Sequence, residues 1–201
     1  MESALVLADG RLTLGQLLSP AFRFPDLDEV FIDCCETNLG QVQISDDVLT
    51  LNTGFLCAGA RGVISSLWSV EDLGTCLFSI FYHQLRQEGK NRSLALQLGQ
   101  RQLRELTGKE LKKKYKKELE EALEEKLEAA YKQLQEIERR LDSYAEGSAE
   151  YQELEEEREK LVAIYERIFD TKNKYLKAAC KKQHPFEHPA YWSAFICAGL
   201  S

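Results

Sequence analysis

The sequence predicts an α/β fold in which a mainly parallel sheet is flanked by helices and a long helical hairpin is inserted into the chain. Short apolar segments alternate with segments of helical spacing before residue 107, which is typical of a parallel sheet covered by helices. Residues 107–178 differ sharply in composition, since they hold 16 of the 26 Lys and Arg and 19 of the 33 Asp and Glu. These two observations separate a sheet domain from a helical appendage.

The amino-terminal part is predicted to form a strand, a short helix and a second strand. Residues 4–8 are a compact apolar run that ends at Asp-Gly. Thr13 is expected to be a helix N-cap, with Gln16 at the spacing of a capping box. Residues 30–32 are β-branched and aromatic and are predicted to form a strand that leads through Asp33 into Cys34 and Cys35.

The elements that follow continue this alternation. A helix is predicted over residues 48–58, a strand over 62–68 and a helix over 72–85. After the charged block, residues 184–189 form a turn-rich link because they contain two prolines. Residues 191–199 then supply a last buried strand.

The charged block is predicted to be an antiparallel coiled-coil hairpin. Gly147 can end the first helix in a left-handed conformation and Ser148 can cap the second. We therefore assign residues 1–106 and 179–201 to the sheet domain and 107–178 to the inserted hairpin. Arg158 and Lys172 occupy seam positions, which weakens the seam and sets its register. The other seam positions are Leu123, Leu127, Ala130, Leu134, Ile137, Leu141, Tyr144, Tyr151, Leu154, Leu161, Tyr165, Ile168 and Tyr175.

Composition argues against two classes of partner. No apolar run approaches the roughly 18 residues of a membrane-spanning helix, so no membrane partner is expected. The net charge of -7 argues against nucleic acid, and the basic run at residues 112–117 is read as a solvated helix face. The start of the chain lacks the features of an export signal and the six cysteines are expected to be reduced, so a cytoplasmic location is predicted.

Cys35 is the candidate catalytic residue. It follows an apolar strand, and open α/β sheets place their ligand sites at the carboxyl ends of strands. Spacing alone leaves another interpretation open, in which Cys35 is a small core residue.

The residues around Cys35 resemble a known family. Residues 31–40 read Phe-Ile-Asp-Cys-Cys-Glu-Thr-Asn-Leu-Gly, similar to the cysteine strand of CHAT domains, in which a hydrophobic strand precedes Ser-Ala-Cys-Glu-Thr-Gly-Leu-Gly. Cys35 aligns with the nucleophile of that family. Further blocks match in the same order, at residues 55–68, 69–72 and 188–195, and residues 4–13 resemble the segment that follows the family's histidine motif.

The resemblance implies a caspase- or separase-like cysteine endopeptidase acting on a protein substrate. A thiolate on Cys35 would attack the scissile carbonyl, and a histidine on a neighbouring strand would assist protonation of the leaving amine. The backbone amides of Cys35 and of the glycine after that histidine would stabilise the oxyanion. The family's histidine would precede Ser3, so we expect an upstream half-domain or a partner chain to supply it. The sheet is accordingly expected to be incomplete at its amino end.

Asp72 is the candidate substrate-binding residue. In separases, which resemble this region, an aspartate at this spacing helps to bind a basic side chain before the cleaved bond. The alternative is that Asp72 is an acidic helix start, because a carboxylate there stabilises the helix dipole.

No cofactor and no metal are predicted. Cys180, His184 and His188 have spacing compatible with zinc, but a fourth ligand is undefined and the two prolines already explain the segment as a turn. His83 falls within a predicted helix, where a solvated side chain is expected.

Two functions remain open at this point. The first is a peptidase half-domain that is inactive as this chain alone. The second is an inactive CHAT-fold interaction module whose hairpin recruits a coiled-coil protein partner.

Overall fold

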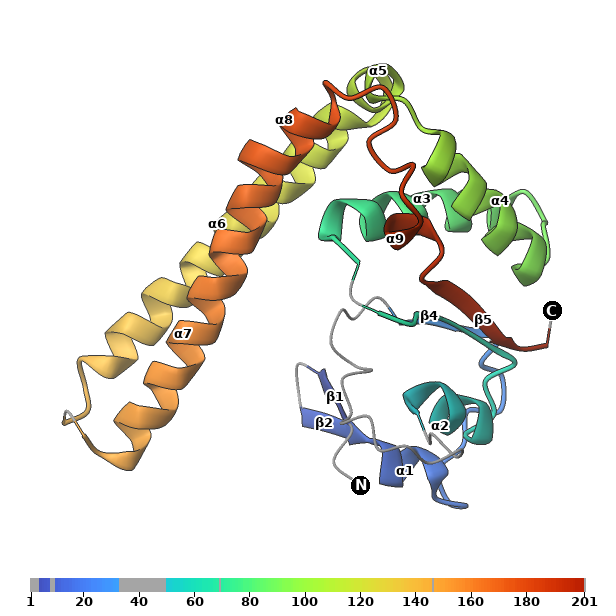
Figure 1. The fold of residues 1–201 in the computed structure, drawn as a ribbon. Helices are drawn as coiled ribbons and strands as arrows, with labels where there is room; N and C mark the ends of the chain where they lie inside the picture. Colours follow the sequence, from blue (N-terminus) through green and yellow to red (C-terminus); the bar gives the residue numbers. More distant parts are fainter. Residues whose placement is uncertain (1–3, 8–9, 33–49, 69, 146, 201) are drawn as a thin grey trace. The chain divides into compact units, whose positions relative to one another are not determined.

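The computed structural model describes residues 4–7, 10–32, 50–68, 70–145 and 147–200 (Figure 1). The chain divides into two compact units. One comprises Met1–Glu105 and Phe186–Ser201, and the other comprises Leu106–Pro185. None of the described helices is both long and apolar enough to cross a membrane.

The first unit contains a three-stranded sheet of order β3-β4-β5. Strand β3 (Glu29–Phe31) runs parallel to β4 (Gly62–Ser66), whereas β5 (Phe195–Gly199) runs antiparallel to β4. The predicted mainly parallel sheet is therefore wrong for the described strands. The direction of β5 follows from where the chain re-enters the sheet. Leu67 N donates to Ala194 O over 2.9 Å, so β5 begins beside the carboxyl end of β4 and runs back along it.

A separate two-stranded antiparallel sheet precedes this one. Strand β1 (Ala4–Leu7) pairs with β2 (Gly10–Thr13), which the sequence analysis missed although Asp-Gly between apolar segments is a strong hairpin signal. The capping box before α1 (Leu14–Leu18) is confirmed. Gln16 N donates to Thr13 Oγ1 over 3.2 Å, and Thr13 N donates to Gln16 Oε1 over 2.8 Å.

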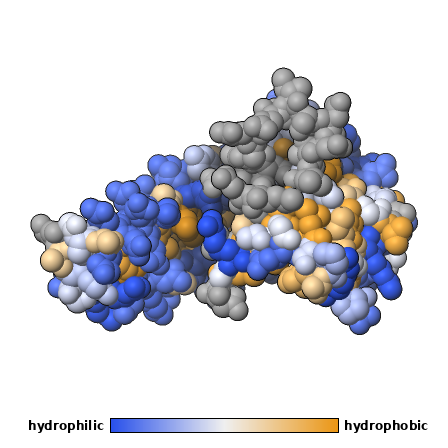
Figure 2. Space-filling model, turned by 90° about the horizontal axis from the view of Figure 1, so that it is seen from below, coloured by the Kyte–Doolittle hydropathy of each residue, from blue (hydrophilic) through white to orange (hydrophobic). Residues whose placement is uncertain are grey.

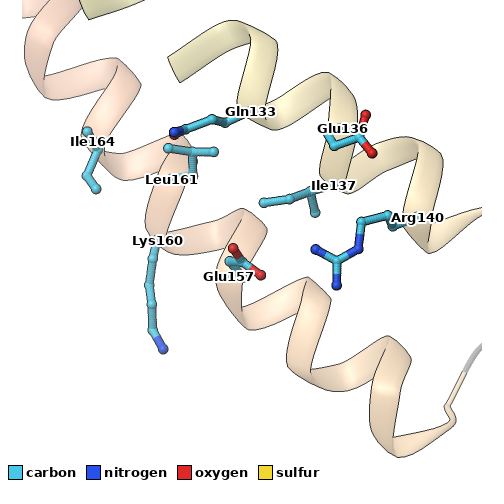
Figure 3. A pocket seen from close by; sticks show the side chains of 8 residues that line it. All are labelled: Gln133, Glu136, Ile137, Arg140, Glu157, Lys160, Leu161 and Ile164. Atoms are coloured by element: carbon cyan, nitrogen blue, oxygen red, sulfur yellow. The ribbon is translucent and has the colours of Figure 1, made fainter. Parts of the chain in front are cut away.

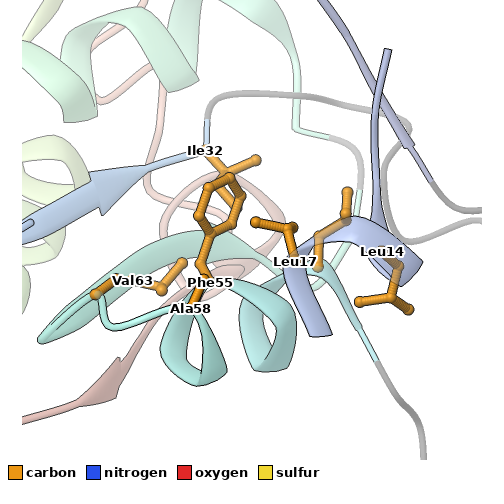
Figure 4. Packing of buried hydrophobic residues seen from close by; sticks show 8 residues of the cluster. Leu14, Leu17, Ile32, Phe55, Ala58 and Val63 are labelled. Atoms are coloured by element: carbon orange, nitrogen blue, oxygen red, sulfur yellow. The ribbon is translucent and has the colours of Figure 1, made fainter. Parts of the chain in front are cut away.

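One face of the three-stranded sheet is covered by α1 and α2 (Leu51–Cys57). Helix α2 lies within the predicted range 48–58 and is capped by Thr50. Figure 4 shows side chains from both helices meeting Ile32 and Val63 of the sheet. The buried residues of this cluster are Leu14, Leu17, Ile32, Leu51, Phe55, Ala58, Ala60 and Val63.

The other face packs against α3 (Asp72–Gln87) and α4 (Arg92–Glu105) (Figure 1). Because strand side chains alternate, Phe31 and Ile64 point to the face opposite Val63. The rings of Phe78 and Phe195 stack with centroids 3.7 Å apart. A short helix, α9 (Pro189–Trp192), leads into β5. The first unit is therefore a sheet between two helical layers.

The second unit is an antiparallel helical hairpin (Figure 1). Its arms are α6 (Lys116–Leu141) and α7 (Ala149–Asp170). The predicted turn is confirmed, because Gly147 has φ 86° and Ser148 caps α7 by accepting from Tyr151 N over 3.2 Å. Figure 2 shows a mainly hydrophilic hairpin surface interrupted by apolar patches. The ends of the arms comprise α5 (Gly108–Glu110), the π-helical turns η1 (Leu111–Tyr115) and η2 (Thr171–Tyr175), and α8 (Leu176–Ala179).

Several predicted packing positions are buried, but the prediction fails at Tyr144 beside the tip and at Tyr175 towards the other end of the second arm, because both are exposed. Ile137, Leu141 and Leu154 form one buried cluster, as the seam predicts. Tyr175 is exposed, and Leu176 beside it is completely buried. The extra residue of a π-helical turn shifts the register by one position, so Leu176 takes the place predicted for Tyr175.

Candidate functional site

The candidate site lies at the sheet edge where β3 and β4 end. The two strands are parallel with Phe31 opposite Ile64, so their carboxyl ends reach the same edge. Ile32 is buried and its N–H donates to Ile64 O over 2.8 Å, which extends the pairing by one residue. Cys35 follows three residues later and lies, with Cys34, outside the described residues. Its assignment as nucleophile stays a prediction.

The chain leaving β4 presents apolar side chains at this edge. Leu67 and Trp68 are exposed, and Trp68 Nε1 donates to Ala190 O over 3.1 Å. Val70 is buried beneath the start of α3. The connection between β4 and α3 therefore exposes Leu67 and Trp68 and buries Val70.

Asp72 is the first residue of α3 and is half-buried. A carboxylate in the first turn of this 16-residue helix is stabilised by the helix dipole, which agrees with its reading as a helix start. The same position follows the carboxyl end of β4 by a few residues. Its predicted role in substrate binding is compatible with this position and stays a prediction.

A hydrogen bond that the sequence analysis missed supports the same edge. Asn52 Nδ2, in the first turn of α2, donates to Ser65 Oγ over 2.6 Å. Ser65 is buried and is the fourth residue of β4. This bond fixes the first turn of α2 beside the end of β4, and a polar pair thirteen residues apart gives no signal in sequence spacing.

The three histidines occupy other positions. His83 is an exposed residue of α3, as predicted, and its ring lies 5.0 Å from that of Phe31. His188 caps α9, where its Nδ1 accepts from Ala190 N over 3.2 Å. His184 is half-buried after α8. Within the described ranges, no three His, Cys, Asp or Glu side chains converge as a metal site requires.

The cysteines that the structure describes form no disulfide with one another. Cys57 and Cys76 are exposed, whereas Cys180 and Cys197 are partly buried. Burial raises the pKa of the Cys180 thiol and of the Cys197 thiol above the ordinary value. Both are therefore weaker nucleophiles at neutral pH than an unperturbed thiol.

A charged network occupies the opposite edge of the sheet, where β3 and β4 begin. Arg92 is buried, and its Nη2 lies 2.6 Å from Asp28 Oδ1. Tyr82 donates its hydroxyl to Glu29 Oε2 over 2.8 Å, and burial together with this bond raises the pKa of Tyr82 well above its ordinary value. Arg86 completes the network through a 3.2 Å contact between its Nε and Glu29 Oε2. These charges neutralise one another, so the network is structural.

Two shallow grooves lie on the hairpin. One, of about 350 Å³, runs between the arms with Ile137 and Leu161 in its lining (Figure 3). The other, of about 360 Å³, is nearer the tip and is lined by Glu138, Leu141, Asp142, Tyr144, Tyr151 and Arg158. Neither groove has the convergent nucleophile and proton donor that an active site needs.

Comparison with known proteins agrees with the motifs. A search of curated proteins and a search of solved structures each found no match for this chain. The family model of the CHAT domain matches residues 1–200 and so covers the hairpin as well as the sheet. That the hairpin is an insertion, with the boundaries given above, stays a prediction. Because the match spans both units, the chain belongs to the CHAT domain family.

Proposed function

We propose that this chain is the carboxyl-terminal part of a caspase- or separase-like cysteine endopeptidase domain, with Cys35 as its nucleophile. The Cys35 thiolate adds to the scissile carbonyl of a protein substrate. Collapse of the tetrahedral intermediate expels the amine, which takes a proton from a histidine, and water then hydrolyses the acyl-enzyme. The histidine comes from outside this chain, on an upstream segment or a partner chain.

The observation that carries the proposal is the parallel pair formed by β3 and β4. Both strands end at one sheet edge, and the segment containing Cys35 departs from that edge directly after the buried Ile32. Among the described strands, β3 pairs with β4 alone, so the side of β3 that faces away from β4 can pair with a further strand. A histidine-bearing strand added there would bring a proton donor to the edge from which the Cys35 segment leaves.

The proposal includes a preference for basic side chains. Asp72 begins α3 just after β4 leaves the same edge, where a carboxylate can pair with an arginine or lysine before the cleaved bond. We also place the activity in the cytoplasm, because thiols outside any disulfide, such as that of Cys57, persist in reducing compartments.

The test is cleavage of fluorogenic peptides with Arg, Lys, Leu or Met before the scissile bond. The chain alone should not cleave these peptides, because the proposal places the proton donor outside this chain. Adding an upstream segment with the His-Gly motif should produce turnover, and Cys35→Ala should lower it at least about a thousandfold. Cys34→Ala is the matched control and should retain activity. Asp72→Asn should slow the Arg and Lys peptides selectively.

Brief iodoacetamide treatment gives an independent measurement. Cys35 should be labelled in preference to Cys34, since successive strand residues point to opposite faces. Preferential labelling of Cys34, or turnover by the chain alone that Cys35→Ala abolishes, would contradict the proposed site. In the second case His83, His184 or His188 would have to supply the proton.

A second candidate function is an inactive interaction module. The observation in its favour is the hairpin, which leaves large apolar side chains such as Tyr131 and Phe169 exposed. Absence of turnover in every combination above, with the hairpin still binding a partner, would favour this function over the peptidase.

A further inference from the structure

One face of the hairpin carries a strip of apolar side chains from both arms. On α7, Val162, Tyr165 and Phe169 recur at three- and four-residue steps and so share a helix face. Val162 is 38% exposed and Phe169 46%, and the rings of Tyr165 and Phe169 stack with centroids 6.5 Å apart. On α6, Tyr131 is 54% exposed and Leu134 lies three residues further on. We name these five residues the aromatic face.

One ion pair and one groove show that charged residues of the two arms lie on the same side of the hairpin. Lys172 in η2 forms an ion pair with Glu124 on α6, and Arg158 on α7 lines the tip groove together with Glu138. Tyr131 is midway in sequence between the two glutamates, and Tyr165 is midway between the two basic residues. The apolar strip is therefore bracketed by charge at each end.

The bracketing charges differ between the two arms. The first arm contributes Glu124 and Glu138 from α6, whereas the second contributes Arg158 from α7 and Lys172 from η2. Arg158 also contacts Glu155 of its own helix over 2.6 Å. A second hairpin, related by a two-fold axis parallel to the arms, would lay its α6 over this α7. Each acidic pair would then meet a basic pair, and Tyr131 would meet the partner's Tyr165.

The groove in Figure 3 lacks this arrangement. There each arm carries both signs, with Glu136 and Arg140 on α6 and Glu157 and Lys160 on α7. Ile137 in its lining is already 4% exposed, and Ile164 alone among its lining residues is a large exposed apolar side chain. The aromatic face has the larger apolar surface and the self-complementary charges.

We propose that the aromatic face binds the same face of a second copy of this chain, forming a four-helix bundle with the two hairpin tips side by side. Such an interface is isologous, because both copies use the same surface and every contact across the two-fold axis occurs twice. Burial of the aromatic side chains supplies the attraction, and the sorted charges select the parallel orientation. This inference does not depend on the chemistry of Cys35.

The first experiment measures the mass of the full chain by sedimentation from about 1 to about 100 μM, a range in which dimers of ordinary affinity assemble. A concentration-dependent dimer is expected. Phe169→Ser should raise the dimer dissociation constant at least about tenfold, because it removes an exposed aromatic anchor. Ile164→Ser is the matched control, since it changes a similarly exposed side chain of the same helix beside the other groove. It should leave the dissociation constant unchanged.

The second experiment separates association from folding. One variant carries Glu124→Lys and Glu138→Lys, and the other carries Arg158→Glu and Lys172→Glu. Each alone should be monomeric because like charges meet across the axis, while an equal mixture should form a heterodimer in which both contacts are again opposite in charge. Circular dichroism of each variant checks that the hairpin remains helical.

Three results would overturn the proposal. The first is a wild-type chain that stays monomeric throughout the range, which would leave the face to another protein or to solvent. The second is an Ile164→Ser variant that weakens the dimer as much as Phe169→Ser. The third is a mixture of folded charge variants that associates no better than either variant alone.

Discussion

Arg92 joins three segments of the chain at the amino edge of the sheet. Its Nη1 donates to Leu200 O and its Nη2 to Asp28 O, each over 2.8 Å. Its Nε lies 3.1 Å from Glu29 Oε2, an ion-pair contact that lacks hydrogen-bond geometry. A Cβ on residue 62 would lie 2.6 Å from Arg92 Cδ, so Gly62 leaves the space through which this side chain passes.

Arg92→Ala should lower the free energy of unfolding by about 2–4 kcal/mol, because it leaves the carbonyls of Leu200 and Asp28 without their charged donor and removes one of the two arginines that contact Glu29. Urea unfolding followed by circular dichroism measures the change. Arg101→Ala is the control, since its pair with Glu105 is largely exposed, and it should leave the unfolding midpoint unchanged. Equal effects of the two substitutions would show that the Arg92 network contributes little.

Sequence reasoning could not have found this network. An arginine just after Asn91 at the start of a helix has the pattern of a solvated residue, and its carboxylate partners lie some sixty residues earlier in the chain. Thr13 shows the opposite case, because a capping box is complete within four residues and was predicted correctly. Interactions between neighbours in sequence can be predicted from the chain, and those between distant segments cannot.

The hairpin shows the same limit at the scale of an element. Spacing predicts the arms and their turn because each depends on local helical geometry, and Ser148 and Gly147 are where the pattern places them. It misplaces Tyr175 because the π-helical turn η2 adds a residue that no spacing rule anticipates. The direction of β5 was likewise missed, since it depends on where the chain re-enters the sheet.

Deleting one residue from η2 tests this account of the register. Removal of Asn173 should convert the turn to regular α-helix and leave Leu176 in place, so the free energy of unfolding should change by less than about 1 kcal/mol. Deleting Ala163 from the regular part of α7 should rotate the helical residues after it by about 100° relative to those before it. The lost packing should lower the free energy of unfolding by roughly 3 kcal/mol. Thermal unfolding of both variants measures the difference. An equally large loss for the Asn173 deletion would show that η2 is not a simple one-residue insertion.

At the scale of the whole molecule, the motifs predict the family correctly, whereas the alternation of elements predicts the sheet only in part. The family resemblance was confirmed over residues 1–200, although the parallel sheet expected from it is limited to β3 and β4 among the described strands. The order of the motifs along the chain identified the family although the direction of β5 differs from the expected one. The proton donor differs, because we propose that it lies outside this chain, where no spacing within the chain can specify it.

The two ends of the hairpin unit meet, which makes its removal a test of how the chain is divided. Gly108 N donates to Lys182 O over 3.2 Å and to Gln183 O over 3.3 Å, so a short linker can join the flanking residues without stretching either end. The sheet unit keeps its own core on both faces, through Leu17 and Phe55 on one and Phe78 on the other.

Replacing residues 109–181 with a few Gly and Ser should therefore leave a sheet unit that unfolds cooperatively, because closing a short flexible loop costs little entropy. The variant should also be monomeric at every concentration, since the aromatic face is gone. Thermal unfolding by two probes measures the first expectation and sedimentation the second. A gradual transition without a common midpoint would show that the sheet needs the hairpin to fold. A cooperative variant that still dimerises would assign self-association to the sheet unit, where the unpaired edge of β3 is the surface available for it.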